Sequence, residues 1–162
     1  MSLWEQLAAW PAWKYLATFL VSMVPVAELR VGIPLGVSLG LHHITAMLLG
    51  ILGNMVPVPF IILFIRRIFA WMRRKIPRLG RFVDRMEQKA ERKREFIQKW
   101  KVIGLVLLVA IPLPGTGAWT GALVAAVLDI RLKHALPAIF LGVVVAALLV
   151  TGLTYGFTGI FL

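Results

Sequence analysis

The sequence predicts an all-α integral membrane protein built from two similar halves. Apolar residues make up 60% of the 162 residues and occur in long blocks, unlike the periodic patterns of soluble domains. Two blocks, residues 44–65 and 135–162, carry no charge and exceed the roughly 20 helical residues that cross a bilayer. Basic residues gather between the two halves. Together these observations exclude a soluble globular domain.

Residues 1–14 precede the first apolar run and contain Trp4, Trp10 and Trp13 with one acid and one base. They lack the charged start and the apolar core of a cleaved signal sequence. We expect an interfacial segment that stays on the mature protein.

Each half continues with a short apolar run and then a cluster of helix-breaking residues, at residues 25–36 and 112–117. A ten-residue helix rises about 15 Å, half of the roughly 30 Å hydrocarbon core, so each run is predicted to stop at mid-membrane. The two runs and their return segments predict re-entrant helical hairpins over residues 15–41 and 102–128, each followed by one spanning helix. Two Pro-kinked helices that cross completely, giving four spans, are the alternative.

Residues 66–101 form a basic linker that holds fourteen of the 18 Lys and Arg residues against four acids. The positive-inside rule places such a connection in the cytoplasm, which makes the plasma (inner) membrane the expected location. One crossing in each half then gives two inverted repeats. We expect the linker to be a helix that lies on anionic lipid, or a connector that only sets the topology. Because the excess positive charge is confined to this one connection, nucleic-acid binding is not expected.

Glu28 and Arg30 are the charged residues inside the apolar part of the first half, within the break that also contains Pro34. Charges at membrane depth usually mark a pathway, a proton site or an ion pair. Arg30 can bind a phosphate or carboxylate with two parallel hydrogen bonds, and Glu28 can carry a proton. Residues two apart do not align on a helix, so a direct pair needs an irregular backbone. A purely structural role for both residues is the alternative.

The second break offers backbone groups in place of charges. Its prolines leave carbonyls without helical donors, its glycines allow close approach, and a helix that begins after it presents N–H groups that attract anions. Asn54, followed by Pro57 and Pro59, interrupts the first spanning helix, and we expect it to cap or hydrogen-bond a hairpin tip. The candidate binding residues are Glu28, Arg30, Pro34, Asn54, Pro112, Pro114, Gly115, Thr116, Gly117, Trp119 and Thr120.

The composition also limits the chemistry. The chain has no cysteine, which excludes disulfides and thiolate chemistry. The sequence contains no paired carboxylates, no nucleophile beside a base and no metal-ligand spacing. We therefore expect neither an enzyme nor a resident metal or cofactor.

Three motifs resemble a known family. They are residues 28–36 (ELRVGIPLG), 54–60 (NMVPVPF) and 111–123 (IPLPGTGAWTGAL), and they resemble the small multidrug export proteins over nearly the whole chain. The paired hairpins are also similar to the DedA/VTT superfamily, whose members are linked to proton-driven lipid translocation. That family carries an acid and arginines at its breaks, a pattern that Glu28 and Arg30 match in the first half alone.

The resemblance implies a proton-coupled transporter of amphiphilic molecules such as a phosphate-bearing (polyprenyl phosphate) lipid. The substrate is expected where the hairpin tips meet, with Arg30 and backbone N–H groups on the anion and Glu28 carrying the proton. Export of lipophilic drugs and a non-transporting scaffold are the alternatives. Membrane lipids are the expected partners, and a homodimer is plausible because few helices are available to enclose a pathway.

Overall fold

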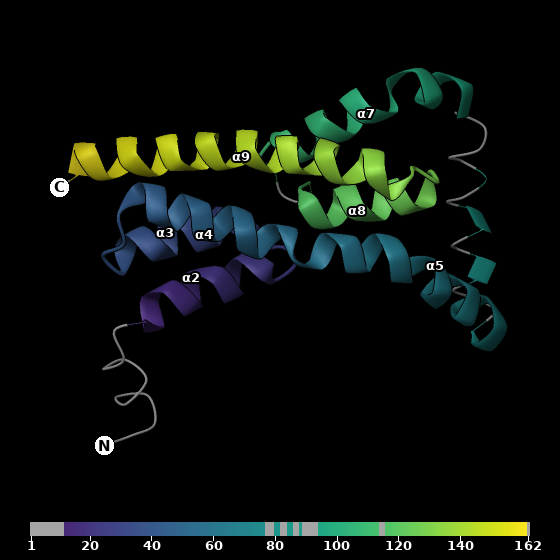
Figure 1. Ribbon diagram of the computed structural model, residues 1–162, viewed down its shortest axis with the longest axis horizontal. Helices are drawn as coiled ribbons and strands as arrows, with labels where there is room; N and C mark the ends of the chain where they lie inside the picture. The colour runs from purple at the N-terminus through teal and green to yellow at the C-terminus, as the bar shows by residue number, and fades with distance from the viewer. Residues whose placement is uncertain are drawn as a thin grey trace. The chain divides into compact units, whose positions relative to one another are not determined.

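The computed structural model describes residues 12–76, 80–81, 84–85, 88, 94–113 and 116–161 (Figure 1), and each regular element within these ranges is an α-helix. Residues 1–11 of the expected interfacial segment lie outside them, as do Pro114 and Gly115 of the second break. The chain divides into two compact units. The first consists of Met1–Val56 and Val144–Leu162, and the second of Pro57–Val143.

In the first unit, three short helices pack against one another: α2 (Trp13–Met23), α3 (Glu28–Ser38) and α4 (His43–Met55). Glycines allow this close approach. A Cβ on Gly32 of α3 would overlap the Ser22 Oγ of α2, and a Cβ on Gly53 of α4 would lie 3.0 Å from the Ser22 Cβ. The C-terminal part of α9 (Leu132–Phe161) completes this unit.

The first break is shorter than the sequence predicts. Only residues 24–27 leave helical structure, and most of the expected break over residues 25–36 lies within α3. Pro34 lies inside this helix, although it has no N–H to donate. A packed helix tolerates one missing backbone hydrogen bond, so the prediction that residues 25–36 break the helix is wrong for residues 28–36. The segment after the break is therefore an 11-residue helix, equal in length to α2.

In the second unit, α8 (Ala118–Val127) packs against both α5 (Pro57–Lys75) and α7 (Arg94–Ala110). The first part of α9 also belongs to this unit. A Cβ on Gly121 of α8 would lie 2.5 Å from a methyl group of Val109 in α7, and one on Gly142 of α9 would lie 2.7 Å from the Val109 Cβ. Glycines again set the distance between the helices.

Two stretches are long and apolar enough to cross a membrane, His43–Lys75 and Leu132–Gly156. The first is interrupted at Val56, where α4 ends and α5 begins with Pro57, close to the interruption that the sequence predicts. Proline fits the first position of a helix because the N–H there has no helical partner. Large apolar side chains face outward on both stretches: Phe60, Leu63 and Phe64 on α5, and Leu148, Leu149 and Leu153 on α9. Such continuous exposed apolar surface is typical of contact with lipid.

The helices on either side of the predicted basic linker extend into it. α5 continues to Lys75 and α7 begins at Arg94, so both ends of residues 66–101 belong to helices that enter the apolar core of the second unit. Near the end of α5, the Arg73 Nε lies 2.9 Å from the Oδ1 of Asp84, a residue of the connection to α7, in a partly exposed ion pair. Exposed pairs of this kind contribute about 1 kcal/mol or less to stability.

The helices that follow the two breaks, α3 and α8, end in the same way. Gly40 after α3 and Asp129 after α8 both have left-handed backbone, with φ of +80° and +56°. In each half the next residue donates its N–H back to the helix, from Leu41 to the Gly36 carbonyl and from Ile130 to the Ala125 carbonyl, both at 2.9 Å. This is the Schellman end, in which one left-handed residue closes the helix.

Candidate functional site

Four buried polar side chains lie in the first unit. Thr18 and Ser22 on α2 are fully buried, Asn54 on α4 is 1% exposed, and Glu28 at the start of α3 is 4% exposed. Among the described residues these are the polar or charged side chains that are buried. The three mutually packed helices therefore enclose a polar interior within an apolar exterior.

The two hydroxyls of α2 satisfy themselves on their own helix. Ser22 Oγ donates to the Thr18 carbonyl at 2.7 Å, and Thr18 Oγ1 donates to the Lys14 carbonyl at 2.8 Å. Such bonds to the preceding turn allow a hydroxyl to enter an apolar interior at low cost. Both side chains face the partner helices, since Thr18 lies against Gly36 and Ser22 lies against Gly32 and Gly53.

Glu28 holds an unusual backbone conformation. Its φ is +46°, a left-handed value that is uncommon for a residue with a side chain, and its N–H donates to the Val24 carbonyl at 2.9 Å. This conformation directs the chain from the break into α3 and places the carboxyl in the interior. Strained backbone of this kind is concentrated at functional sites.

Asn54 is buried with its Oδ1 atom unpaired: within the described part of the chain, that atom has no hydrogen-bond partner. The same holds for His43 Nε2 and Thr151 Oγ1, and all three residues belong to the first unit. His43 also stacks edge-on against Tyr155, with 5.1 Å between ring centroids. A buried polar atom without a partner costs about 1–3 kcal/mol, so atoms of this kind indicate a place for water, a proton or a ligand.

The second unit repeats the packing of the first without its polar groups. Gly121 and Gly142 lie against Val109 as Gly32 and Gly53 lie against Ser22. By position in the two hairpins, the counterparts of Thr18, Ser22, Glu28 and Asn54 are Leu105, Val109, Gly117 and Val143, all of them buried. The positive φ recurs as well, since Gly117 has φ +135° where Glu28 has +46°. The same helical framework thus has a polar interior in one unit and an apolar interior in the other.

The candidate residues fall into both units. Glu28, Arg30, Pro34 and Asn54 lie in the first unit, whereas Pro112, Thr116, Gly117, Trp119 and Thr120 lie in the second. Arg30 is only partly buried, whereas Glu28 is 4% exposed.

Thr116 has a structural function that the sequence did not suggest. Its Oγ1 contacts the carbonyl oxygens of Ile111 and Leu113 at 2.7 and 2.8 Å and accepts from the Leu113 N–H at 3.2 Å. The hydroxyl thus replaces helical partners that the break removes. Pro112, Trp119 and Thr120 are partly exposed beside it.

Sequence reasoning missed Thr18, Ser22, His43 and Thr151, because each was counted within an apolar run or a turn. One signal was available: Thr18 and Ser22 are four residues apart, which places two hydroxyls on one helical face. Among the described residues, no three His, Asp or Glu side chains gather as metal ligands.

Two bilayer-length apolar helices, accompanied by shorter apolar helices in paired hairpins, define a multi-helix membrane protein. Residues 28–149 match the sequence model of a family described as "Putative small multi-drug export protein", and the chain belongs to this family. The match begins at Glu28, directly after the first break, and includes the second break. No curated protein and no solved structure matches the chain.

Proposed function

We propose that this protein is a proton-coupled membrane transporter of amphiphilic molecules, with its proton site at Glu28. The burial of the Glu28 carboxyl, 4% exposed in a chain of bilayer-length apolar helices, carries this proposal. The family's description as an export protein supports transport as the activity. Ser22 and Asn54 are buried polar residues of the same unit, which makes the first unit the favoured place for the site.

A buried carboxyl couples a proton to a substrate through its charge. The ionised form is costly in a low-dielectric interior unless a partner compensates it, and the protonated form is neutral and can donate a hydrogen bond. Substrate binding that favours one form therefore binds or releases a proton. The orphan Asn54 Oδ1 offers an acceptor in the same unit for a donor on the substrate or for water.

The sign of the substrate's charge determines the direction of coupling. A phosphate-bearing lipid would bind with protonated Glu28, because an ionised carboxylate repels an anion; proton and substrate then move together. A lipophilic cation would compete with the proton, so the two would be exchanged. The partly buried Arg30 favours the anionic substrate, and the family description favours drug export as the second candidate.

We further propose that each hairpin is re-entrant and that the halves form inverted repeats, in the manner of the DedA/VTT proteins. The lengths support this: 11 residues in α2 and in α3 and 10 in α8 rise about 15–17 Å, half of the hydrocarbon core. In the second unit, Lys101 on α7 and Arg131 after α8 line one pocket. Two basic residues side by side at the two ends of the hairpin support a hairpin that returns to the face at which it started, and we place that face and the basic linker on the cytoplasmic side.

Purified protein reconstituted in liposomes tests the proposal. The probes are a fluorescent polyprenyl phosphate and the lipophilic cation tetraphenylphosphonium, each with a pH gradient of either sign. Glu28→Gln removes the titratable group while keeping its size. Asp84→Asn makes the same carboxyl-to-amide change at a half-exposed position and serves as the matched control.

Gradient-driven movement of either probe by wild type and Asp84→Asn, lost in Glu28→Gln, supports the proposal, and the effective gradient identifies symport or exchange. If wild type and Glu28→Gln move both probes at the rate of protein-free vesicles, transport is rejected and the scaffold alternative stands. If both proteins move a probe equally well above that rate, the role of Glu28 is rejected.

A further inference from the structure

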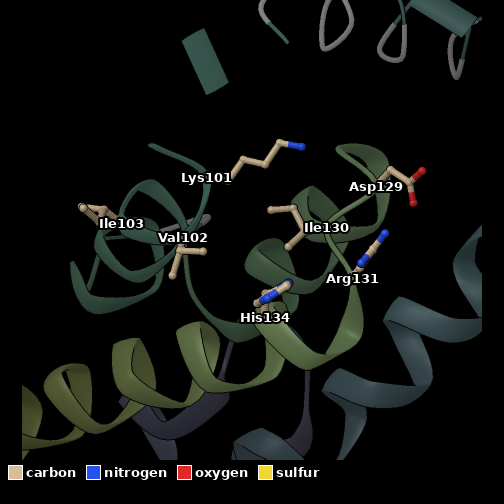
Figure 2. A pocket seen from close by; sticks show the side chains of 7 residues that line it. All are labelled: Lys101, Val102, Ile103, Asp129, Ile130, Arg131 and His134. Carbon is tan, nitrogen blue, oxygen red and sulfur yellow. The ribbon is translucent and has the colours of Figure 1, made fainter. Parts of the chain in front are cut away.

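A pocket of about 480 Å³ lies in the second unit, where the start of the apolar part of α7 meets the turn between α8 and α9 (Figure 2). Figure 2 shows Lys101, Val102 and Ile103 on one side and Asp129, Ile130 and Arg131 on the other, with His134 between them. None of these residues belongs to the polar interior of the first unit.

The charges around this pocket are mostly positive. Lys101 and Arg131 carry full charges, His134 contributes an imidazole ring, and Asp129 is the acid of the set. Arg131 and His134 also lie at the N-terminal end of the 30-residue helix α9, which has no acidic residue in its first turn. The positive end of a helix dipole attracts anions and disfavours cations. Basic side chains at this end add to its positive potential, and Asp129 offsets them only in part, because the lining holds two cationic side chains and one acid.

The remaining walls of the pocket are apolar. Val102 and Ile103 are exposed on α7, and Ile130 closes the pocket from the turn. Each side of the pocket thus combines a positive group with aliphatic side chains, which fits an amphiphile with an anionic head. The phosphate of such a head is the group that arginine binds best, with two parallel hydrogen bonds.

The first unit shows that this charge is not required by the fold. At the matching positions of its own hairpin, Lys14 replaces Lys101, but His42 replaces Arg131 and Thr45 replaces His134. His42 performs a local task there, since its Nδ1 accepts the Ile44 N–H at 3.4 Å at the start of α4. The turn closes in both halves, so Arg131 and His134 are additions to the second half.

We propose that this pocket is a binding site for a phosphate ester, held by Arg131, Lys101 and His134 at the N-terminus of α9. The ligand is either the headgroup of an anionic lipid or a free phosphate, which share this chemistry. The site is separate from Glu28, and the proposal does not depend on transport.

Direct binding to the purified protein in a non-ionic detergent tests this assignment. The probes are dioctanoyl phosphatidic acid, dioctanoyl phosphatidylcholine and inorganic phosphate, with dissociation constants measured by titration calorimetry. Arg131→Gln and Lys101→Gln each remove one charge from the pocket, and both residues lie at the surface, where a change to Gln is compatible with folding. Lys133→Gln removes a charge from the same turn of α9 without lining the pocket.

We expect wild type and Lys133→Gln to bind phosphatidic acid alike, and Arg131→Gln and Lys101→Gln to bind it about tenfold or more weakly, as for a lost charge-assisted hydrogen bond. Binding of phosphatidic acid without inorganic phosphate identifies a lipid headgroup site, and binding of both identifies a site for the phosphate group itself. The proposal is overturned if wild type binds neither phosphatidic acid nor inorganic phosphate, or if phosphatidylcholine binds as tightly as phosphatidic acid. It is also overturned if all three variants lose the same affinity.

Discussion

Gly53 of α4 lies directly against the Phe19 carbonyl oxygen of α2, so that a Cβ added to Gly53 would overlap that oxygen. Gly142 of α9 has the same relation to Val106 of α7, where an added Cβ would lie 2.9 Å from the carbonyl oxygen. Because the obstacle in both cases is backbone, the helices must separate to admit a methyl group.

Replacement of these glycines by alanine is predicted to loosen the helix packing. Gly53→Ala and Gly142→Ala should each lower the free energy of unfolding by about 1–3 kcal/mol, the usual cost of overpacking. Thermal unfolding in detergent measures the effect. Gly104→Ala and Gly152→Ala are the controls, because open space surrounds both positions and alanine favours the helix by about 0.5–1 kcal/mol. Equal melting temperatures for all four variants would contradict the packing described here.

Asn54 is predicted to reduce stability in return for function. Its Oδ1 is buried without a partner in the described part of the chain. Asn54→Leu should therefore leave the free energy of unfolding unchanged or raise it by up to about 1–3 kcal/mol, which thermal unfolding in detergent measures. The same variant should lose gradient-driven transport in liposomes. A destabilised Asn54→Leu, or one that transports as wild type does, would remove Asn54 from the site.

Thr116 is predicted to hold the second break in shape through its hydroxyl. Thr116→Val keeps the branched side chain but removes the contacts with Ile111 and Leu113, and should cost about 1 kcal/mol or more. Thr116→Ser keeps the hydroxyl and should unfold at nearly the wild-type temperature. If Ser and Val behave alike, the hydrogen bonds at the break are not what stabilises it.

Single cysteines can distinguish the re-entrant hairpins from four full crossings, because the natural chain has no cysteine. If the second hairpin is re-entrant, Lys133→Cys lies on the same side as Gln88→Cys in the linker, and Ser38→Cys lies on the opposite side. A membrane-impermeant thiol reagent applied outside intact cells should then label only Ser38→Cys. Labelling of Lys133→Cys from outside would instead favour the four-span arrangement.

Sequence patterns were informative where they depended on length and on proline. The interruption at Pro57 and the all-helical character of the described residues follow from these features. The extent of α3 did not follow, because proline's penalty was expected to outweigh packing. Pro34 instead lies within a helix whose Gly32 and Gly36 fit closely against α2.

The polar interior could be predicted only in part. Glu28 and Asn54 were evident as polar residues in apolar blocks, whereas Thr18 and Ser22 satisfy their hydroxyls on their own helix and leave little trace in composition. Which face of an apolar helix turns inward depends on its neighbours, and hydrophobic periodicity is weak when lipid surrounds the protein. The contrast between Ser22 and Val109 depends on which side chains lie against Gly32, Gly53, Gly121 and Gly142, and composition does not carry that information.

Proton flux through the purified protein tests the account most directly. Vesicles that contain a trapped pH-sensitive dye and carry wild type, Glu28→Gln or Asp84→Asn are given the substrate identified in the transport assay, without a pH gradient. The account predicts that substrate addition changes the internal pH with wild type and Asp84→Asn, and not with Glu28→Gln. A substrate-dependent pH change of wild-type size in Glu28→Gln would contradict a proton site at this residue.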